Sequence, residues 1–435
     1  MRGQSAADIL VIGGGIMGLW GAVKAAEAGL SVILVDRGAI AGGASGGVMG
    51  AMFPWMPDRW DAKKQFQYDA LVTLPQELAR LEAATGVSAG FRRSGRIIPL
   101  PKPHLKTIAL RHQADAIRNW HQGEHRFFWH VADAPPVADY IAPDFAAGGY
   151  VHDTMAARLE PRAVAALLRA WLEMQSHVRI LEHAGLVELD ATKGRANVTV
   201  SSSSPVAYAP PSPRWGEETL VATVAANSLF SPAGRRWSEG PDEGGAGERS
   251  ITFSHAFIAA GVESFSILES LMPTLPSPLG QGVKGQAALL RVDLDPALPV
   301  AFLDGLYVVP HENGHVAVGS TSENSYADPF STDAQLDTVL DKARALVPAL
   351  RDAPVIERWA GIRPKAVGRD PLIGPVPGQP NIISLTGGFK ISFGMAHRLA
   401  ACAVDYALGH EPPGLPENFT LAGQIEKAFG AGGEG

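Results

Sequence analysis

The sequence predicts an α/β protein with more than one domain, on the strength of three observations. Residues 8–35 alternate between strand-like and helix-like patterns, whereas residues 53–150 are richer in Trp, Phe, His and Pro. The chain has 435 residues, which is too many for one ordinary core. Hydrophobic residues make up 46% of it and charged residues 19%, so it has enough apolar material for two globular lobes.

The N-terminal segment is expected to form a strand, a helix and a second strand. Asp8–Ile12 is a short apolar run, Gly15–Ala28 has helical periodicity that Gly29 ends, and Leu30–Val35 is again strand-like. Glycines and charged residues inside this stretch distinguish it from a signal peptide. Since no other stretch approaches about 18 uninterrupted apolar residues, we expect no transmembrane segment.

A phosphate-binding loop is expected between the first strand and the helix. In Gly13-x-Gly15-x-x-Gly18, the first glycine makes a tight turn, the second lets the backbone approach a pyrophosphate, and the third lets helix and strand pack closely. Asp36, at the end of the second strand, is placed to accept hydrogen bonds from a ribose. This pattern predicts a dinucleotide site in a Rossmann-like domain, and a glycine-rich turn without a ligand is the alternative.

A second glycine-rich loop favours a flavin over a nicotinamide. Gly42–Gly50 contains five glycines, and a plain NAD domain has no need of it. The second phosphate and the ring of a flavin need close approach of the backbone. A flexible loop without a ligand is the alternative.

The other predicted elements follow periodicity and turn signals. Helices are expected at Ala62–Thr85, Pro161–Glu173, Asp333–Val347 and Gly394–Leu408. Strands are expected at Gly95–Leu100, Thr252–Ala259 and Asn381–Leu385, with a strand pair at His177–Leu181 and Leu186–Asp190 and a hairpin of Leu306–Pro310 and His315–Gly319. The dipeptide Asn313-Gly314 suits the tight turn of that hairpin.

A low-complexity insert is expected at Ser201–Ser250, which is rich in Ser, Pro, Gly, Glu and Arg. Such a segment cannot bury enough surface to offset its ordering entropy. Within it, Ser212–Glu217 is echoed by residues 231–240, as in a translated repetitive element. We expect a disordered surface insertion without function, and a partner-binding loop is the alternative.

Three further motifs occur in order near the C-terminus: Trp359-Ala-Gly-Ile-Arg-Pro364, Asp370-Pro-Leu-Ile-Gly-Pro375 and Thr386-Gly-Gly-Phe389. Together with the two glycine-rich loops, they resemble the D-amino-acid oxidase superfamily of FAD-dependent oxidoreductases. The resemblance is to the branch of glycine oxidase and sarcosine oxidase, and it extends to iminodiacetate oxidase. It covers nearly the whole chain except the insert.

The resemblance implies a Rossmann-like FAD-binding domain interleaved with an α+β substrate domain on a mainly antiparallel sheet. The FAD-binding domain would comprise residues 1–52, 151–200, 251–285 and 360–435, and the substrate domain residues 53–150 and 286–359. Val283–Gln286 resembles the short link back into the substrate domain. FAD is expected to be noncovalent, because no cysteine stands directly after Pro364, where some sarcosine oxidases attach FAD, and the single cysteine, Cys402, fits a buried helix position.

The cofactor-binding residues that these loops and the resemblance indicate come from six segments. They are Gly13, Gly15, Ile16, Met17, Gly18, Asp36, Arg37, Gly43, Ala44, Ser45, Gly261, Gly361, Arg363, Gly387, Gly388, Phe389 and Lys390.

By resemblance, Arg363 binds the carboxylate of the substrate, because its planar pair of donors matches that group. The alternative is a structural ion pair with Glu357 or Asp370. Tyr307 and His311 are further candidates for contact with substrate; otherwise Tyr307 packs and His311 lies exposed in a turn.

The implied enzyme is an oxidase that removes hydride from the carbon next to the amine of a small amino acid or secondary amine. Glycine, sarcosine or iminodiacetate types are expected, giving an imine, then an oxo acid, with hydrogen peroxide from molecular oxygen. Lys365, Arg369 and Lys390 depart from the family pattern. Such cations suit a dicarboxylate substrate, and solvated surface side chains are the alternative.

A second departure from the family pattern concerns the electron acceptor. His315–Gly319 matches a strand in which monomeric sarcosine oxidases carry an oxygen-activating lysine, and it has none. Lys284, Lys390 or a histidine takes its place, or the enzyme is a D-amino-acid dehydrogenase that reduces a quinone. From another class, a non-catalytic or partner-dependent flavoprotein subunit stays possible.

Composition excludes several other classes. The net charge is −7 and no basic run fits a row of phosphates, so we expect no nucleic-acid partner. No histidine pair has the spacing of a metal site. One cysteine fits a reducing compartment, and we expect the cytoplasm. The sequence does not indicate the oligomeric state.

Overall fold

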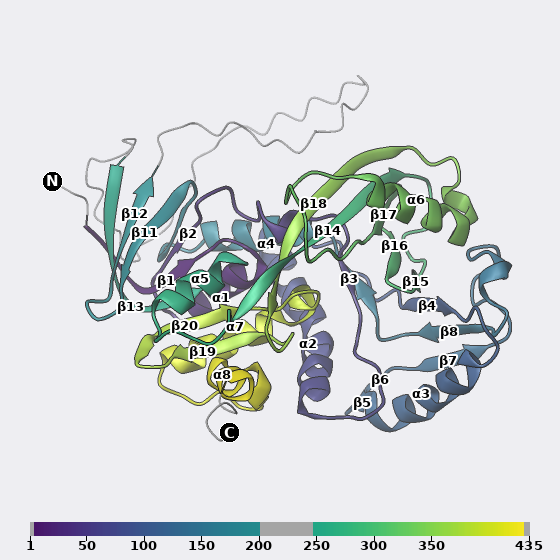
Figure 1. The fold of residues 1–435 in the computed structure, drawn as a ribbon, viewed down its shortest axis with the longest axis horizontal. Coiled ribbons are helices and arrows are strands. Elements are labelled where there is room, and N and C mark those ends of the chain that lie inside the picture. Colours follow the sequence, from purple (N-terminus) through teal and green to yellow (C-terminus); the bar gives the residue numbers. More distant parts are fainter. Residues whose placement is uncertain (1–3, 201–246, 430–435) are drawn as a thin grey trace.

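The computed structural model describes residues 4–200 and 247–429, which form two lobes, each built around a large sheet (Figure 1). The predicted α/β fold class is confirmed. Residues 201–246 of the predicted insert lie outside the described residues. The predicted end of the insert is wrong, because Gly247–Ser250 begin strand β13 (Gly247–Ile258), where they pair with β12 and β1.

The first sheet has the strand order β10-β2-β1-β13-β12-β11, and β20 and β19 continue it beside the end of β13. The strands β10, β2, β1, β13 and β20 are parallel, as the strand-helix-strand start predicts. The bounds are β1 Gln4–Ile12, β2 Val32–Val35, β10 Val178–Leu181, β11 Ala184–Asp190, β12 Arg195–Val200, β19 Leu372–Val376 and β20 Gln379–Thr386.

One predicted pairing in this sheet is wrong. The strands expected at His177–Leu181 and Leu186–Asp190 both exist, but β10 adds to β2 and β11 pairs with β12 instead. Strand β12 was not predicted; it is the antiparallel partner of β11 and joins it to β13.

Alternating side chains of β1 supply two separate cores. Ile9 and Val11 point into the core under α1 (Ile16–Glu27), α4 (Pro161–Glu173) and α7 (Ser392–Ala407). Leu10 and Ile12 point to the opposite core, which α5 (Glu263–Ser270) and α8 (Leu421–Phe429) cover. The sheet therefore has helices on both faces, as parallel sheets require.

Helix α2 (Ala62–Thr85) matches its predicted bounds, with the Asp61 carboxylate accepting from the amide of Lys64 at its start. Pro75 inside the helix cannot donate to the carbonyl of Leu71. The guanidinium of Arg93 donates to that carbonyl at 2.5 Å instead. The hydrogen bond from Arg93 therefore connects α2 to the segment that follows it.

The second sheet has the order β18-β14-β17-β16-β15-β4-β8-β7 and is antiparallel except between β15 and β4. The predicted hairpin is confirmed, with positive φ at Asn313 and Gly314. Helices α6 (Ala334–Leu346) and α3 (Leu105–Asn119) pack against this sheet. The bounds are β4 Arg96–Pro99, β7 Trp129–Ala132, β8 Tyr150–Asp153, β14 Gly280–Arg291, β15 Val300–Leu303, β16 Leu306–Pro310, β17 His315–Gly319 and β18 Val355–Ala366.

Strands β14 and β18 form a long two-stranded ladder that reaches from the second lobe to the first (Figure 1). Val283–Gln286, expected to link the two domains, lie in the middle of the 12-residue strand β14. The division into a nucleotide domain and a substrate domain thus stays a proposal.

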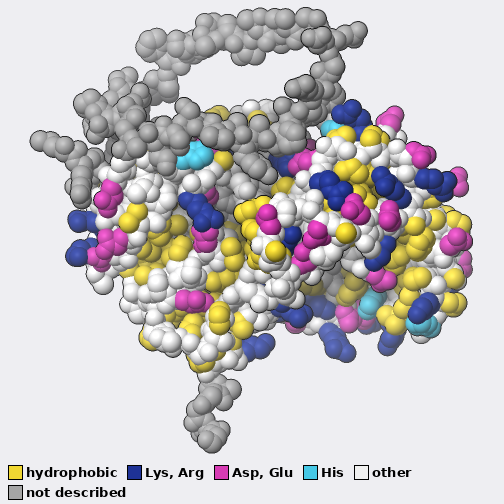
Figure 2. Space-filling view, turned by 45° about the horizontal axis from the view of Figure 1, so that its top comes forward, with side chains coloured by type: hydrophobic (Ala, Val, Ile, Leu, Met, Phe, Trp, Pro, Cys, Tyr) yellow, Lys and Arg dark blue, Asp and Glu magenta, His cyan; other side chains and the backbone are white. Residues whose placement is uncertain are grey.

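None of the described helices is long and apolar enough to cross a membrane. On the face shown in Figure 2, Lys and Arg side chains are interspersed with Asp and Glu over the described surface of the second lobe.

Candidate active site

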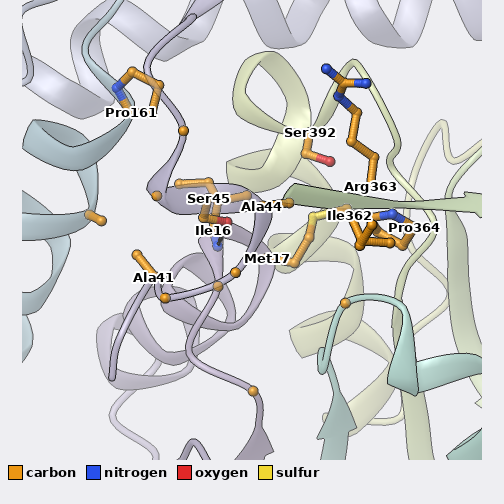
Figure 3. A pocket seen from close by; sticks show the side chains of 18 of the residues that line it. Ile16, Met17, Ala41, Ala44, Ser45, Pro161, Ile362, Arg363, Pro364 and Ser392 are labelled. Atoms are coloured by element: carbon orange, nitrogen blue, oxygen red, sulfur yellow. Dashed lines mark hydrogen bonds between the residues drawn. The ribbon is translucent and has the colours of Figure 1, made fainter. Parts of the chain in front are cut away.

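A cavity of about 1520 Å³ lies between the two sheets and is lined by residues of both lobes. One end is formed by the loop after β1, the end of β2 and the loop 42–50. The other end is formed by β16, β18 and the loop before α7 (Figure 3).

The three glycines of the first loop differ in how strictly the chain requires them. Gly13 has φ +107°, and a Cβ there would meet the carbonyl oxygen of Ala259 at 2.4 Å. A Cβ on Gly18 would lie 1.8 Å from the carbonyl oxygen of Gly13, so helix and loop touch there as predicted. A Cβ on Gly15 would meet only the Ser45 Oγ, at 3.3 Å. Gly15 therefore leaves open space at the N-terminus of α1, the position at which a phosphate binds.

Asp36 organises the edge of this loop. Its carboxylate accepts from the amide of Gly14 at 2.6 Å and from the amide of Gly38 at 2.8 Å, and it faces the cavity. Arg37 lies beside it, exposed, and forms an ion pair with Glu263. A ribose at this end would find a carboxylate already held in place by two backbone donors.

The second glycine-rich loop closes over the first. The buried Ser45 Oγ accepts from the amide of Ile16 at 2.9 Å, and Ala44 lies beside it in a short 3-10 turn (Figure 3). On the outer side, Arg162 of α4 donates to the carbonyl of Gly46 at 2.7 Å. The indole of Trp359 packs over Gly47, where a Cβ would lie 3.1 Å from the ring. Both loops thus form one cradle of backbone atoms.

These features fit FAD. The cavity combines the open amides at the start of α1, a carboxylate at the end of β2 and a wide continuation toward the second sheet. Met17 reaches from α1 toward Ile362 and Pro364 of β18, where the two lobes meet (Figure 3). Gly43 and Gly261 also line the wall, so the backbone stays close to a ligand there.

Arg363 projects from β18 into the second half of the cavity (Figure 3). Its Nη2 donates to the Ser320 Oγ at 2.9 Å and its Nη1 donates to the carbonyl of Thr321 at 3.2 Å. Burial lowers the pKa of the guanidinium, and Glu323 partly offsets that effect. The guanidinium keeps unused N–H donors for a ligand.

The structural alternative for Arg363 is not borne out among the described residues. Glu357 accepts two hydrogen bonds from Arg162, at 2.9 and 2.5 Å. Asp370 pairs with Lys63 at 2.7 Å. Both carboxylates that the sequence offered to Arg363 therefore bind other cations.

Tyr307 and Lys390 lie in the same half of the cavity. The ring of Tyr307 stacks on Phe53, with ring centroids 5.2 Å apart. Burial raises the pKa of Tyr307, and the charges of Arg96 and Arg363 oppose that rise. Lys390 is exposed toward the cavity mouth, and partial desolvation and the charge of Arg363 lower its pKa.

Five of the predicted site residues do not line the cavity. Four are glycines that serve packing or turns beside it: Gly18, Gly361, Gly387 and Gly388. The fifth is His311, which is 4% exposed and lies behind the cavity wall, 2.9 Å from the carbonyl of Val48. Burial lowers its pKa to about 4, so the imidazole is neutral. An exposed turn position for His311 is wrong, because the hairpin packs under the loop 42–50.

The other cations proposed from the sequence lie elsewhere. Lys365 and Arg369 follow Arg363 but do not line the cavity. Lys284 is buried, and its Nζ lies 3.9 Å from Glu323. Along β17 the side chain that joins the apolar wall near Tyr307 is Ala317, so that strand supplies no lysine, as the sequence indicated.

Several wall residues were not predicted: Met49, Phe53, Arg162 and Ser320. Met49 lies in the glycine-rich loop and Phe53 follows it closely, so their nearness in sequence was an available signal. Ser320 follows β17, and only the structure shows that this segment runs beside β14.

The fold and this cavity define a flavin-dependent oxidoreductase. Over residues 8–402 the chain matches the family described as FAD dependent oxidoreductase, and it belongs to that family. Cys402 is buried in α7, and burial raises the pKa of its thiol to about 12, in agreement with the predicted packing role.

Known relatives place the chain near glycine oxidases. The glycine oxidase of Pseudomonas putida is 26% identical over 435 residues, an alignment that covers 96% of this chain and 99% of that protein. The structure of glycine oxidase from Geobacillus kaustophilus is similar with a TM-score of 0.75 at 16% identity, covering 96% and 98% of the two chains. Iminodiacetate oxidase from Chelativorans sp. BNC1 is similar with a TM-score of 0.70 at 20% identity, covering 94% and 97%. The protein is a glycine oxidase-like FAD-dependent oxidoreductase.

Proposed function

We propose that the protein oxidises the C–N bond of a small amino acid or secondary amine that carries a carboxylate, of the glycine, sarcosine or iminodiacetate type. The observation that carries this proposal is Arg363, a guanidinium without an ion-pair partner among the described residues, held by Ser320 and Thr321 at the cavity wall. A guanidinium in that state suits a substrate carboxylate.

The residues of the first loop, Asp36 and the loop 42–50 would hold noncovalent FAD, which when bound accepts the hydride from the carbon next to the amine. Arg363 would fix the carboxylate and so orient that carbon. Tyr307 and Phe53 would cover the bound substrate from the side and exclude water. On this basis we assign the described residues of the predicted segments 1–52, 151–200, 251–285 and 360–435 to the FAD-binding domain, together with Gly247–Ser250 of β13.

The amine must be neutral before the carbon next to it can give up a hydride. The charges of this half of the cavity favour the neutral amine. The acidic residues of the wall are Asp36, Glu263 and Glu357, and each is engaged at the opposite end or in an ion pair. The positive charges of Arg363 and Lys390 disfavour an ammonium nearby. The pocket therefore assists deprotonation without a catalytic base.

Lys390 extends the proposal to dicarboxylates. Lys390 is a second cation in the same half of the cavity. It lies close enough to Arg363 for the charge of the guanidinium to lower the pKa of the lysine. An iminodiacetate-type substrate would place one carboxylate on Arg363 and the other on Lys390. The likeness to the fold of iminodiacetate oxidase supports testing this substrate first.

We propose molecular oxygen as the acceptor, with hydrogen peroxide as co-product, in a cytoplasmic enzyme. One observation favours the second candidate, a dehydrogenase that reduces a quinone or another acceptor. Among the described residues that line the cavity none comes from β17, and Lys284 lies outside the cavity, 3.9 Å from Glu323.

The test is to mix the purified yellow protein without oxygen with glycine, sarcosine, iminodiacetate, proline and D-alanine. Substrate-dependent bleaching of the flavin absorbance supports the proposed reaction, and no bleaching with any of them contradicts it and favours a partner-dependent subunit. Peroxide formation in air then separates an oxidase from a dehydrogenase.

A further inference from the structure

The position of Arg363 depends on a glycine in the neighbouring strand. In the β14–β18 ladder Gly285 pairs with Gly361, two positions from the Val283–Arg363 pair, on the same face of the sheet. A Cβ on Gly285 would lie 2.1 Å from Nη2 and 2.2 Å from Cζ of Arg363. The guanidinium therefore lies directly over bare backbone, which any side chain would occupy.

The other side of the guanidinium is held by the segment that follows β17. Ser320 and Thr321 supply the two acceptors. This segment is itself fastened to β14 by backbone hydrogen bonds: Glu323 and Lys284 exchange two, each 2.9 Å long, and Thr321 donates to the carbonyl of Gln286 at 3.2 Å. Residues 320–323 thus continue beyond β17 along the same side of β14.

Buried side chains fix that edge in turn. The Thr321 Oγ1 accepts from the amide of Gln286 at 2.8 Å and donates to the carboxylate of Glu323. The Gln286 side chain donates to Glu323 at 3.0 Å and to Asp333 at 2.9 Å. Lys284 and Glu323 are 2% and 8% exposed, and the lysine lies 3.9 Å from the carboxylate. Lys284, Gln286, Thr321 and Glu323 are buried, whereas Asp333 is exposed.

This arrangement separates Lys284 from the cavity. Successive side chains of a strand point to opposite faces, so Lys284 and Gln286 lie on the face away from Gly285 and Arg363. Lys284 does not line the cavity, and its charge stabilises Glu323 instead. A buried ion pair contributes little net stability, because the cost of desolvating both charges offsets their attraction.

We propose that Gly285 and the buried network of Lys284, Gln286, Thr321 and Glu323 are positioning elements that set the orientation of Arg363, and through it the binding of a carboxylate-bearing substrate. The inference rests on the proposed function of Arg363 as the carboxylate clamp. These residues act through Arg363 and touch no substrate themselves.

Gly285→Ala is the sharpest variant. Gly285 is not in the left-handed region, and the atoms that the new methyl meets are the end of a flexible side chain, so the strand accepts alanine and the guanidinium moves. Gly247→Ala is the matched control, because it lies in a strand where a Cβ meets nothing within 4 Å.

Thr321 gives a second pair of variants, in which shape and hydroxyl group are changed separately. Thr321→Val keeps the shape but removes the Oγ1 that joins Gln286 to Glu323, whereas Thr321→Ser keeps that oxygen. A positioning role predicts that serine rescues what valine loses. This pair stays informative if Gly285→Ala fails to fold.

The readout is a titration of each FAD-loaded variant with acetate, a carboxylate that has no amine to oxidise, followed by the change in the flavin spectrum. FAD affinity and thermal stability are measured in parallel. Gly285→Ala and Thr321→Val should retain FAD and stability close to the Gly247→Ala control, while the acetate Kd rises about tenfold or more, as expected for a weakened hydrogen bond to a charged group.

Two results would overturn the inference, and they differ. If Arg363→Ala abolishes acetate binding but Gly285→Ala and Thr321→Val leave the Kd unchanged, the network does not position the clamp. If Arg363→Ala itself leaves the acetate Kd unchanged, the proposed function fails and the inference fails with it.

Discussion

The Ser45 hydroxyl accepts a hydrogen bond from the backbone amide of Ile16 at 2.9 Å, in a buried position. This contact joins two glycine-rich loops that are 29 residues apart in sequence. The pairing places the loop 42–50 over the N-terminus of α1, where a helix favours negative charge. We therefore expect FAD binding to depend on the space that Gly15 leaves between the two loops.

The first prediction concerns that space. In Gly15→Val the Cβ would lie 3.3 Å from the Ser45 Oγ, which the fold tolerates, but the added methyl groups would fill the path of a pyrophosphate. The purified variant should be folded by circular dichroism and colourless. A yellow protein with unchanged flavin content would show that the phosphates bind elsewhere.

The second prediction concerns Lys390 and pH. Desolvation and the charge of Arg363 lower its pKa, and the lysine binds an anion only in its charged form, below that pKa. Affinity for iminodiacetate should therefore decline as pH rises through the lowered pKa, in the alkaline range below 10.5. Lys390→Gln should remove this decline and reduce the preference for iminodiacetate over glycine about tenfold.

The matched substrate for this measurement is glycine, which has one carboxylate and uses Arg363 alone. Equal pH dependence for glycine and iminodiacetate in the unmodified enzyme would show that Lys390 does not contact the second carboxylate.

The third prediction concerns stability. Arg96 and Asp153 form an ion pair of 2.6 Å, with side chains 2% and 0% exposed. Asp153→Ala leaves the guanidinium buried without a partner and should lower the free energy of unfolding by about 3–5 kcal/mol. The exposed pair of Lys106 and Asp133 is the control, since Asp133→Ala should cost about 0–1 kcal/mol. Equal shifts in denaturant midpoint for both variants would refute this account.

The fourth prediction concerns acid sensitivity. Burial lowers the pKa of His397 from 6.5 to about 3, so the folded protein holds the imidazole neutral while the unfolded chain protonates it. A depressed folded pKa gives stability that is present above pH 6.5 and lost as pH falls toward 3. His397→Gln should flatten the loss between pH 6.5 and 4 by about 1.4 kcal/mol per pH unit. Identical pH curves would exclude this contribution.

The sequence predicted those parts of the fold that local signals encode. Helix α2 matches its predicted bounds because Asp61 caps its start and Gly86 ends it with a positive φ. Helix α4 matches because Pro161 occupies its first turn. Strand pairing was harder: β10 and β11 follow each other in sequence but pair with β2 and β12, since registers between distant strands leave no local pattern.

The site residues likewise divide into those that local motifs predict and those that only the pairing of distant strands brings to the site. Gly13, Asp36, Ser45 and Arg363 stand in motifs with fixed spacing, and the cavity brings all four together. Gly285, by contrast, is an ordinary strand glycine until the ladder with β18 places it under the guanidinium. His311 was expected in or near the pocket, but the hairpin turns its side chain behind the cavity wall. The alternation of side chains along a strand does not by itself define which face of the strand borders the cavity.

The central claim is that Arg363 binds the substrate carboxylate, and the most direct measurement compares Arg363→Ala with the unmodified enzyme in an anaerobic titration with the best amino-acid substrate and with acetate. The variant should keep its FAD, while the acetate Kd and the substrate KM rise about 100-fold or more, because loss of one partner of a buried charge pair costs about 2–5 kcal/mol. An Arg363→Ala enzyme with bound FAD and unchanged constants for both ligands would contradict the account.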